Sequence, residues 1–293
     1  MTLGPSPDAS GGDCADRLLS ASGLPRAEAR LLLEHASGRR LEWLLSNGED
    51  PLGELVSERF VSLKTRRLAG EPIAYLVGER EFHGLAFAVD PSVLIPRHET
   101  ELLVEEAIRR APRSGSVIDL GTGSGAIAIA IAAARPDLTV TATDASHEAL
   151  ALAKRNAQRI GAAATRIRFK PGNWWQAAEK AARFDLIVSN PPYLADDDPH
   201  LSEGDLRYEP RTALASGPDG LEALRAIAAG AGDRLVPGGW LLLEHGWQQG
   251  HAVRSVLTGH GFTAVCTLRD LAGHERVTLG QAPARAPGGT DAA

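Results

Sequence analysis

Short apolar runs alternate with helical stretches from Ser116 onward, and this alternation restricts the possible folds of the chain more than any other feature. Strands alternating with helices form right-handed βαβ units, so we expect a mostly parallel sheet covered by helices on both faces. Strands are predicted at Val117–Leu120, Leu138–Asp144, Arg166–Lys170, Phe184–Ser189 and Trp240–Glu244, and helices at Ala126–Ala134 and Glu148–Ile160. A short glycine-containing loop joins Phe262–Leu268 to Glu275–Leu279, which predicts an antiparallel hairpin at the end of the sheet.

The first part of the chain has a different pattern. Between Asp13 and Ala69 the apolar residues recur at helical spacing, and clusters of glycine and proline interrupt them, so we predict a small bundle of short helices. Residues 82–89 alternate around a central glycine, which is typical of a short hairpin. The expected divisions are a helical domain at residues 1–80, a hairpin linker at 81–92, an α/β domain at 93–282 and a disordered tail at 283–293.

Composition and charge argue against several classes of protein. The 293 residues carry a formal net charge of −6, which provides no basic surface for the phosphates of a nucleic acid. Cys14 and Cys266 are far apart, so neither a disulfide framework nor a metal cluster is expected. No apolar run reaches the roughly 18 residues of a membrane span, and residues 1–12 resemble a frayed tail more than a signal peptide. We therefore expect a cytoplasmic protein that binds neither membranes nor nucleic acid directly.

A glycine-rich turn, Gly121–Gly125, lies between the first predicted strand of the sheet and the next helix. Glycines at such a turn let a ligand approach the backbone at the positive end of a helix. NAD, FAD and phosphate groups bind to similar turns, although the spacing Gly-x-Gly-x-Gly departs from the dinucleotide fingerprint. Asp144 ends the following strand, where a carboxylate holds ribose hydroxyls. Its alternative role is in the start of the next helix, beside Ser146 and Glu148.

The sequence Asn190-Pro191-Pro192-Tyr193 directly follows the apolar strand Phe184–Ser189. Ligands bind at the carboxyl ends of strands in open α/β sheets, and two consecutive prolines force an extended path. The Asn190 side-chain oxygen and the Pro191 carbonyl could each accept one hydrogen of a target NH2 group, while Tyr193 packs on its flat face. The alternative is an ordinary turn, since Asn-Pro often begins turns. The buried strand and the upstream glycine turn favour a site that methylates a planar nitrogen.

Several further motifs stand between Gly70 and Leu279: Glu71–Leu76, Leu94–Glu101, Gly172–Trp175, Tyr208–Arg211, Gly220–Leu221, Leu243–Gly246 and Asp270–Arg276. With these motifs the chain resembles the HemK/PrmC family, the protein-(glutamine-N5) methyltransferases that modify class 1 peptide chain release factors. Asn173 stands where the family usually has Asp. Asn-Pro-Pro-Tyr alone would also fit adenine-N6 methyltransferases of DNA or RNA, and the further motifs favour the release-factor family.

The resemblance implies a class I S-adenosylmethionine-dependent methyltransferase fold, a Rossmann-like α/β domain with a terminal antiparallel hairpin. It implies that the N-terminal helical bundle recruits the protein substrate. Asp144 would bind the ribose hydroxyls of S-adenosylmethionine, Trp174 would lie along the adenine, and Asn190 would border the cofactor. The methionine and ribose portions would be lined by Gly121, Thr122, Gly123, Ser124 and Gly125. The target glutamine would be held by Asn190, Pro191, Pro192 and Tyr193, of which Asn190, Pro191 and Tyr193 would be catalytic.

Alternative functions stay open at this point. The chain could methylate another glutamine, such as one on a ribosomal protein, or adenine in a nucleic acid. It could also be a module that binds S-adenosylmethionine without turnover and docks on the translation machinery. We expect Arg97 and Glu99 to pack a loop over the site, and we expect no metal. His245 and His274 are not expected to act as acid or base, because methyl transfer from a sulfonium is downhill and the proton can leave to solvent.

Overall fold

The computed structural model describes residues 13–161, 167–179 and 181–283. The chain divides into two compact units, the first ending at Gly78 and the second beginning at Glu79. This division falls slightly before the boundary expected at residue 80. The frayed start expected at 1–12, and the expected disordered tail apart from residue 283, lie outside the described residues.

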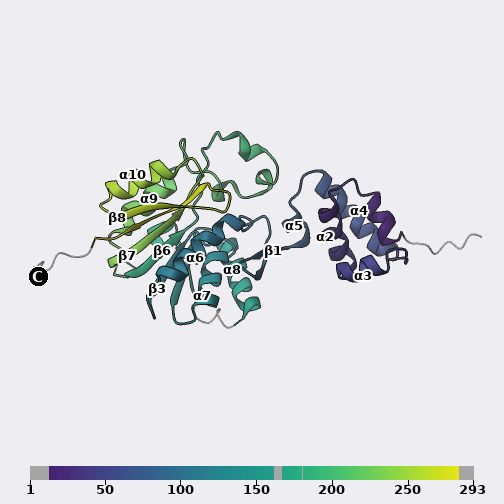
Figure 1. Cartoon of the computed structure of the whole chain (residues 1–293), viewed down its shortest axis with the longest axis horizontal. Coiled ribbons are helices and arrows are strands. Elements are labelled where there is room, and N and C mark those ends of the chain that lie inside the picture. The colour runs from purple at the N-terminus through teal and green to yellow at the C-terminus, as the bar shows by residue number, and fades with distance from the viewer. Residues whose placement is uncertain (1–12, 162–166, 180, 284–293) are drawn as a thin grey trace, which may run out of the picture. The chain divides into compact units, whose positions relative to one another are not determined.

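The first unit is a bundle of short helices with its own apolar core (Figure 1). Arg67 of the fourth helix makes two hydrogen bonds, of 2.8 and 3.0 Å, to the Glu28 carboxylate of the second. The helices are α1 (Ala15–Ser20), α2 (Arg26–Ser37), α3 (Leu41–Ser46), α4 (Glu54–Leu68) and α5 (Ile73–Val77). The core consists of Ala15, Leu18, Leu32, Leu33, Ala36, Leu44, Phe60 and Leu76, whereas Leu31, Leu45, Leu55, Val61 and Leu68 are exposed.

The second unit begins with a hairpin of two antiparallel strands, β1 (Glu79–Phe82) and β2 (Leu85–Ala88). Its aromatic side chains Phe82 and Phe87 are fully buried in the main core of this unit. Fully buried Asn156 exchanges hydrogen bonds of 2.8 and 3.0 Å with the Ala88 backbone. The hairpin is therefore part of the second unit, where the sequence had indicated a separate linker.

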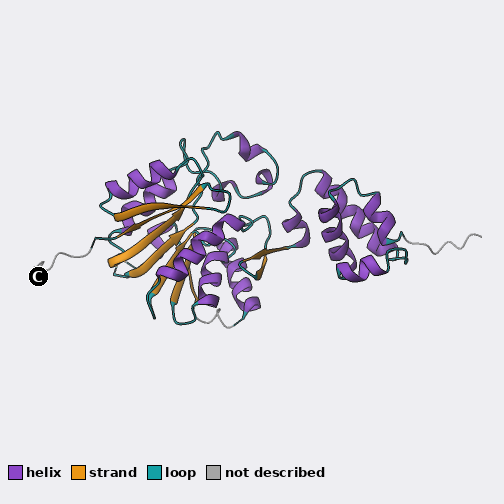
Figure 2. Ribbon diagram, in the orientation of Figure 1, coloured by secondary structure: helices purple, strands orange, loops and turns teal. Residues whose placement is uncertain are grey.

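A seven-stranded sheet forms the centre of the second unit (Figure 2). Its strand order is β5-β4-β3-β6-β7-β9-β8; β3 to β7 run parallel, and β9 is antiparallel to both β7 and β8. The strands are β3 (Ser116–Leu120), β4 (Thr139–Asp144), β5 (Ile167–Pro171), β6 (Phe184–Ser189), β7 (Leu235–Glu244), β8 (Thr263–Arg269) and β9 (Glu275–Gln281). The predicted parallel sheet with a terminal hairpin is confirmed. β7 begins earlier than predicted, because a register shift beside Phe184 accommodates Pro237, Gly238 and Gly239.

Helices cover both faces of this sheet, as the strand–helix alternation predicts. Successive residues of β3 point to opposite faces, so Val117 belongs to one core and Ile118 to the other. On the Val117 side pack α6 (Glu101–Arg110), α7 (Ala126–Ala134) and α8 (His147–Ile160); on the Ile118 side pack α9 (Glu222–Ala231) and α10 (Gly250–Gly259). Helices α6, α9 and α10 lack side-chain N-caps, which removes the usual sequence signal for a helix start.

Single 3-10 turns occupy the loops, at η1 (His98–Thr100), η3 (Trp174–Ala177), η4 (Pro199–Ser202), η5 (Leu206–Tyr208) and η6 (Arg211–Ala213). Among the helices in the described part of the chain, none has the length and apolar character needed to cross a lipid bilayer.

Candidate active site

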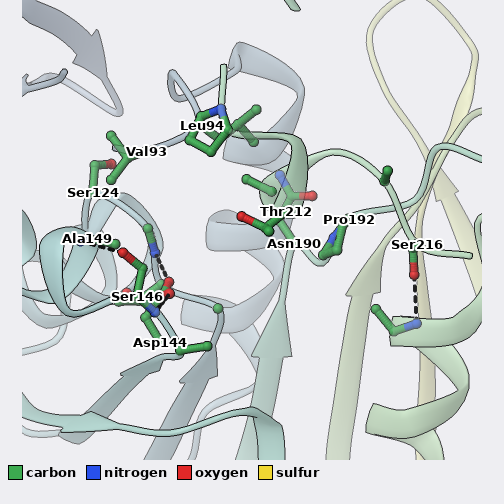
Figure 3. A pocket seen from close by; sticks show the side chains of 18 of the residues that line it. Val93, Leu94, Ser124, Asp144, Ser146, Ala149, Asn190, Pro192, Thr212 and Ser216 are labelled. Atoms are coloured by element: carbon green, nitrogen blue, oxygen red, sulfur yellow. Dashed lines mark hydrogen bonds between the residues drawn. The ribbon is translucent and has the colours of Figure 1, made fainter. Parts of the chain in front are cut away.

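A cavity of about 910 Å³ opens at the carboxyl ends of β3, β4 and β6. Asp144 and Ser146 lie on one side of it, and Asn190 and Pro192 on the other (Figure 3). A parallel sheet delivers the loops that follow its strands to one edge, which explains why these residues meet. The volume is near the upper end of the range for small-molecule sites and leaves room for two ligand groups.

The glycine turn after β3 forms one wall of the cavity. The Thr143 carbonyl at the end of β4 accepts hydrogen bonds from the Gly121 and Thr122 amides, at 2.9 and 2.8 Å, and so fixes the turn to the neighbouring strand. Gly121 has φ +73°, and a Cβ atom there would lie 3.3 Å from the Trp174 ring. A glycine is needed at this position both for the left-handed backbone and for the approach of the indole. Gly121, Thr122, Gly123 and Ser124 all line the cavity.

Gly125, which was predicted to line the cofactor site, lies outside the cavity lining. It lies at the N-cap of α7 with φ +85° and is not among the residues that line the cavity. A Cβ atom at this position would lie 2.8 Å from Ile129 and 3.1 Å from Ala153. The structure therefore gives Gly125 a packing role, in which it lets α7 and α8 approach each other.

The Asp144 carboxylate is held in place by two backbone amides. Oδ2 accepts from Gly123 N at 2.9 Å, and Oδ1 accepts from Ser146 N at 2.8 Å. Burial raises the pKa of Asp144, and the hydrogen bonds from backbone amides oppose that rise. The N-cap of α8 is Ser146, whose hydroxyl accepts from Ala149 N at 3.1 Å. Asp144 is thus a fixed acceptor that faces the cavity.

A buried carboxyl group that sequence reasoning did not single out supports the same turn. Asp119, at 0% exposure, accepts a 2.6 Å hydrogen bond from the Thr122 hydroxyl. Desolvation, reinforced by nearby Asp144, raises the pKa of Asp119 to about 7. Since this pKa lies above its value in an unfolded chain, the contribution of Asp119 to stability declines as the pH rises from about 4 to about 7.

Trp174 and Asn173 border the cavity next to the glycine turn. Trp174 has φ +43°, an uncommon conformation for a bulky residue, and its ring lies over Gly121. The neighbouring Trp175 holds this segment in place, because its Nε1 donates to the carbonyls of Ala226 and Ile227 in α9, at 3.1 and 3.2 Å. Trp174 thus lies at the cavity, while its predicted contact with adenine stays a prediction.

The motif Asn190–Tyr193 follows β6, with its first residue at the cavity. Asn190 Nδ2 donates to the Thr100 hydroxyl at 3.1 Å, whereas Asn190 Oδ1 is buried and has no hydrogen-bond partner among the described residues. Asn190 and Pro192 line the cavity, but Pro191 and Tyr193 do not. The Tyr193 ring packs against the core on the α9 side, and burial raises the pKa of its phenol. The Tyr193 ring, which was predicted to pack on the ligand, therefore packs against the protein core instead.

An ion pair joins the two loops that border the cavity. Arg97 Nη2 lies 2.7 Å from Glu209 Oε2, and Glu209 also accepts from the Ile95 amide at 3.4 Å. The Glu209 side chain is fully buried, while that of Arg97 is 30% exposed and lines the cavity. Burial raises the pKa of Glu209, and the positive charge of Arg97 opposes this. The loop packing expected of Arg97 is seen, and its partner Glu209 was missed.

The two histidines of interest lie away from the cavity lining. His245 is fully buried, with Nδ1 2.9 Å from the Gly246 carbonyl and Nε2 2.8 Å from the Thr278 hydroxyl. Burial lowers its pKa, which favours the neutral ring. His274 is exposed and lies against Trp247, with ring centroids 5.3 Å apart. Both histidines make contacts within the fold and do not line the cavity.

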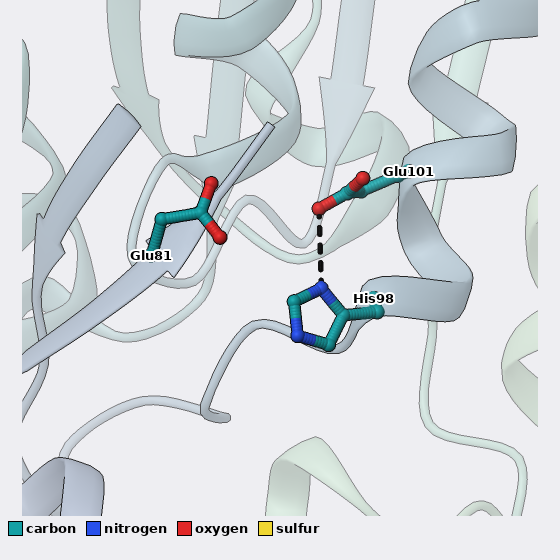
Figure 4. A group of neighbouring side chains, drawn as sticks. All are labelled: Glu81, His98 and Glu101. Atoms are coloured by element: carbon teal, nitrogen blue, oxygen red, sulfur yellow. Dashed lines mark hydrogen bonds and ion pairs between the residues drawn. The ribbon is translucent and has the colours of Figure 1, made fainter. Parts of the chain in front are cut away.

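One group of side chains in the described ranges has ligand atoms close enough for a metal ion: Glu81, His98 and Glu101 (Figure 4). The atoms of this group lie within 4.8 Å of one another. Glu101 Oε1 already accepts from the His83 amide at 3.0 Å and lies 3.3 Å from His98 Nδ1. Glu81 and His98 are exposed, so the contacts present account for the group as part of the hairpin's docking on α6.

Besides Asp119 and Glu209, the structure brings Thr100 and Glu244 to the site. Thr100 lines the cavity and Glu244 is 1% exposed. Both belong to motifs that the family resemblance had marked, Leu94–Glu101 and Leu243–Gly246. Their residue types alone gave no signal, because a threonine before a helix and a glutamate at the end of a strand are common on protein surfaces.

Comparison with known proteins gives the same picture for both units. The family profile of the PrmC N-terminal domain matches residues 13–78, and that of the methyltransferase small domain matches residues 98–203. A release factor glutamine methyltransferase from Bordetella pertussis is 53% identical over 268 residues, covering 90% of this chain and 97% of that protein. Another, from Neisseria gonorrhoeae, is 50% identical and covers 91% and 97%.

A methyltransferase structure from Pyrococcus furiosus shares the fold, with a TM-score of 0.52 at 20% identity over 76% of this chain and 98% of that one. The sheet order and the cavity at its edge define a class I S-adenosylmethionine-dependent methyltransferase. Within this class, the chain belongs to the release factor glutamine methyltransferase family. The resemblance found from the motifs is confirmed.

Proposed function

We propose that this chain transfers a methyl group from S-adenosylmethionine to the side-chain amide nitrogen, N5, of a glutamine in a class 1 peptide chain release factor. The products are N5-methylglutamine and S-adenosylhomocysteine, and the reaction takes place in the cytoplasm. One observation carries the chemistry: the buried Asn190 Oδ1 at the cavity lacks a partner among the described residues. Such an acceptor is unfavourable unless a ligand supplies a donor, and an amide NH2 group does so.

The residues on the other side of the cavity fit the cofactor. The Asp144 carboxylate offers charged acceptors for two ribose hydroxyls, and the Trp174 indole offers an apolar face for adenine. The turn Gly121–Ser124 exposes backbone close to the methionine portion at the start of α7. When bound, S-adenosylmethionine supplies an electrophilic methyl group on a sulfonium sulfur.

The substrate side must make a poor nucleophile reactive, because the amide lone pair is delocalised into its carbonyl. Asn190 Oδ1 accepts one N–H of the target. The Pro191 carbonyl is proposed to accept the other, although Pro191 is not among the residues that line the cavity. Both N–H bonds are then directed away from the line of attack, and the lone pair faces the methyl group. Pro192 supplies the cavity wall beside Asn190, while Tyr193 supports the motif from the core.

The test is incubation of the chain with a purified class 1 release factor and S-adenosylmethionine carrying a labelled methyl group, followed by peptide mapping. We expect the label on one glutamine of the release factor. Label on a ribosomal protein glutamine, or recovery of N6-methyladenine from nucleic acid, would assign another substrate. Failure of single-turnover transfer would leave a module that binds the cofactor without catalysis.

The Asp144→Ala variant is expected to bind S-adenosylmethionine about 10- to 100-fold more weakly, because hydrogen bonds to a charged acceptor contribute roughly 1.5–3 kcal/mol. Isothermal titration calorimetry measures the change. Asp144→Asn removes the charge and keeps one acceptor oxygen, while its NH2 group faces the Gly123 or the Ser146 amide. It should bind S-adenosylmethionine more weakly than the wild type and more tightly than Asp144→Ala. An unchanged dissociation constant in Asp144→Ala would remove Asp144 from the cofactor site.

The first unit recruits the protein substrate, as the match of residues 13–78 to the PrmC N-terminal domain supports. A chain that begins at Glu79 keeps the core of the second unit intact. We expect it to bind S-adenosylmethionine normally and to methylate the release factor with a strongly reduced kcat/KM. Full-rate methylation by the shortened chain would contradict recruitment by this unit.

A further inference from the structure

The motif Asn190–Tyr193 depends on outside contacts for its conformation. Its two prolines, Pro191 and Pro192, carry no backbone N–H and therefore donate no hydrogen bond. Their rings fix φ, but the path of the chain also depends on rotations about ψ, which the rings leave free. The directions of the Asn190 side chain and of the Pro191 carbonyl are therefore set by contacts at the two ends of the motif.

The first end of the motif is fixed to the sheet. Ser189 is the last residue of β6, and its hydroxyl donates to the Leu120 carbonyl of β3 at 2.6 Å. At the second end, the amides of Tyr193 and Leu194 donate to the carbonyl of Leu214, at 3.1 and 2.9 Å. Leu214 belongs to the same long loop as Tyr193, so these two bonds hold the loop to itself.

Gln249 connects the second end to the rest of the unit. It is the N-cap residue of α10, a helix whose Val253 and Leu257 are buried in the core on the same side of the sheet. Its Nε2 donates to the Tyr193 carbonyl at 2.9 Å, and its Oε1 accepts from the Gly246 amide at 2.9 Å. Both partners are backbone groups, of which one can only accept and the other can only donate. The orientation of the Gln249 amide is therefore fixed.

Two glycines make room for this contact. Gly220 has φ +70°, and a Cβ atom there would lie 2.3 Å from the Tyr193 carbonyl oxygen and 3.0 Å from Gln249 Nε2. A Cβ atom at Gly246 would lie 3.1 Å from Gln249 Oε1. A side chain at Gly220 would therefore separate the donor from the carbonyl. The two glycines belong to the motifs Gly220–Leu221 and Leu243–Gly246, to which the methyl-transfer chemistry gives no role.

We propose that Gln249 is a positioning residue, which holds the Tyr193 end of the motif and thereby directs the two acceptors of the target amide. The inference rests on the proposed function, in which these acceptors are Asn190 Oδ1 and the Pro191 carbonyl. Gln249 does not line the cavity, but Pro192, directly before Tyr193, does. A shift of the Tyr193 carbonyl therefore moves the cavity wall, and a misplacement of about 1 Å at a reacting centre lowers a rate by about 10²-fold.

Two variants separate the two bonds of Gln249. Gln249→Glu keeps an acceptor for the Gly246 amide but repels the Tyr193 carbonyl, so kcat should fall about 10- to 100-fold. Gln249→Lys keeps a donor for the Tyr193 carbonyl and cannot accept from Gly246, so its kcat should be higher than that of Gln249→Glu. A kcat in Gln249→Glu equal to or above that of Gln249→Lys would overturn the proposal, because the bond to Gly246 would then be the one that matters.

Gln249→Met controls for charge, since it loses both bonds and adds no charge. Its kcat should fall as in Gln249→Glu, with little change in KM for the release factor, and a near-normal kcat would contradict the inference. The dissociation constant for S-adenosylmethionine, measured by calorimetry, should stay at the wild-type value in all three variants, because the cofactor side is formed by Gly121–Ser124 and Asp144. A loss of cofactor affinity parallel to the loss of kcat would show a general structural role and overturn the proposal.

Nuclear magnetic resonance of the full chain labelled with 15N-asparagine gives a readout that needs no release factor. The chain has four asparagines, Asn47, Asn156, Asn173 and Asn190, and the Asn190→Ala spectrum assigns the side-chain NH2 signals of Asn190. We expect these signals to move in Gln249→Glu and Gln249→Met and to stay near their wild-type positions in Gln249→Lys. Asn190 signals that stay in place in every variant would overturn the proposal. Absence of methyl transfer to the release factor by the wild type, with the Asn190 signals moving as expected, would instead count against the proposed substrate.

Discussion

Replacement of Asn190 by alanine is expected to reduce turnover by about 10² to 10³, comparable to the loss of one preorganised polar group at a reacting centre. Asn190 Oδ1 is the buried acceptor without a partner at the cavity, so its removal leaves the target NH2 held by the Pro191 carbonyl alone. The dissociation constant for S-adenosylmethionine should change little, because the cofactor side is formed by Gly121–Ser124 and Asp144. Single-turnover methylation and calorimetry measure the two quantities separately.

The Asn190→Asp variant is the matched control. It keeps an acceptor oxygen, but it loses the donor to Thr100 and adds a charge to the site. If accepting a hydrogen is the role of Asn190, the aspartate variant should retain more activity than the alanine variant. Equal losses in both would show that the donation to Thr100 shapes the loop. A near-normal turnover in Asn190→Ala would exclude the mechanism.

The sheet was predictable because its strands are buried on both faces. The apolar run 184–189 has its predicted ends in the structure, and so does the helix Ala126–Ala134 after the glycine turn. A buried parallel strand must be apolar at nearly every position, so its length can be read from the sequence. β7 was predicted too short, since Pro237 and two glycines normally end a strand. Here a register shift between Phe184 and Leu186 accommodates them.

The sequence pattern also predicted those cavity residues that lie at or just after the end of a strand. Gly121–Ser124 and Asn190 directly follow a strand and Asp144 is the last residue of one, and the carboxyl ends of parallel strands share one edge. The direction of a side chain within such a turn is a different matter. Tyr193 follows the strand in the same way, but its ring fills space in the core on the α9 side.

Contacts between distant segments were beyond sequence reasoning of this kind. Asn190 and Thr100 are separated by 90 positions, and Ile95 and Glu209 by 114. Asn156 connects the hairpin to the glycine turn, since its Nδ2 donates to the carbonyls of Ala88 and Ser124 at 3.0 and 2.9 Å. Each of these bonds depends on the packing of whole elements, which no local spacing reports.

Replacement of Arg97 by methionine is expected to lower the free energy of unfolding of the second unit by about 3 kcal/mol at pH 8. Removing one partner of a buried ion pair costs roughly 3–5 kcal/mol, because it leaves an uncompensated charge. The lower figure applies because Arg97 is 30% exposed while Glu209 is fully buried. Urea denaturation measures the change, and KM for S-adenosylmethionine should rise because both loops border the cavity.

The effect of Arg97→Met should depend on pH in a definite direction. Burial already raises the pKa of Glu209 with Arg97 present, and loss of the guanidinium raises it further. The carboxyl group of the variant therefore takes up a proton in the folded state at low pH, which relieves the buried charge. Its deficit in stability should be smaller at about pH 5 and should grow as the pH rises through the pKa of Glu209.

The double variant Arg97→Met with Glu209→Gln separates charge from packing. It removes the uncompensated carboxylate and keeps an acceptor for the Ile95 amide, so at pH 8 it should be more stable than Arg97→Met alone. Its stability relative to the wild type should not show the pH dependence of the single variant. If both variants lost the same free energy at every pH, the uncompensated charge of Glu209 would not be the cause of the loss, and the ion pair would not be what stabilises the two loops.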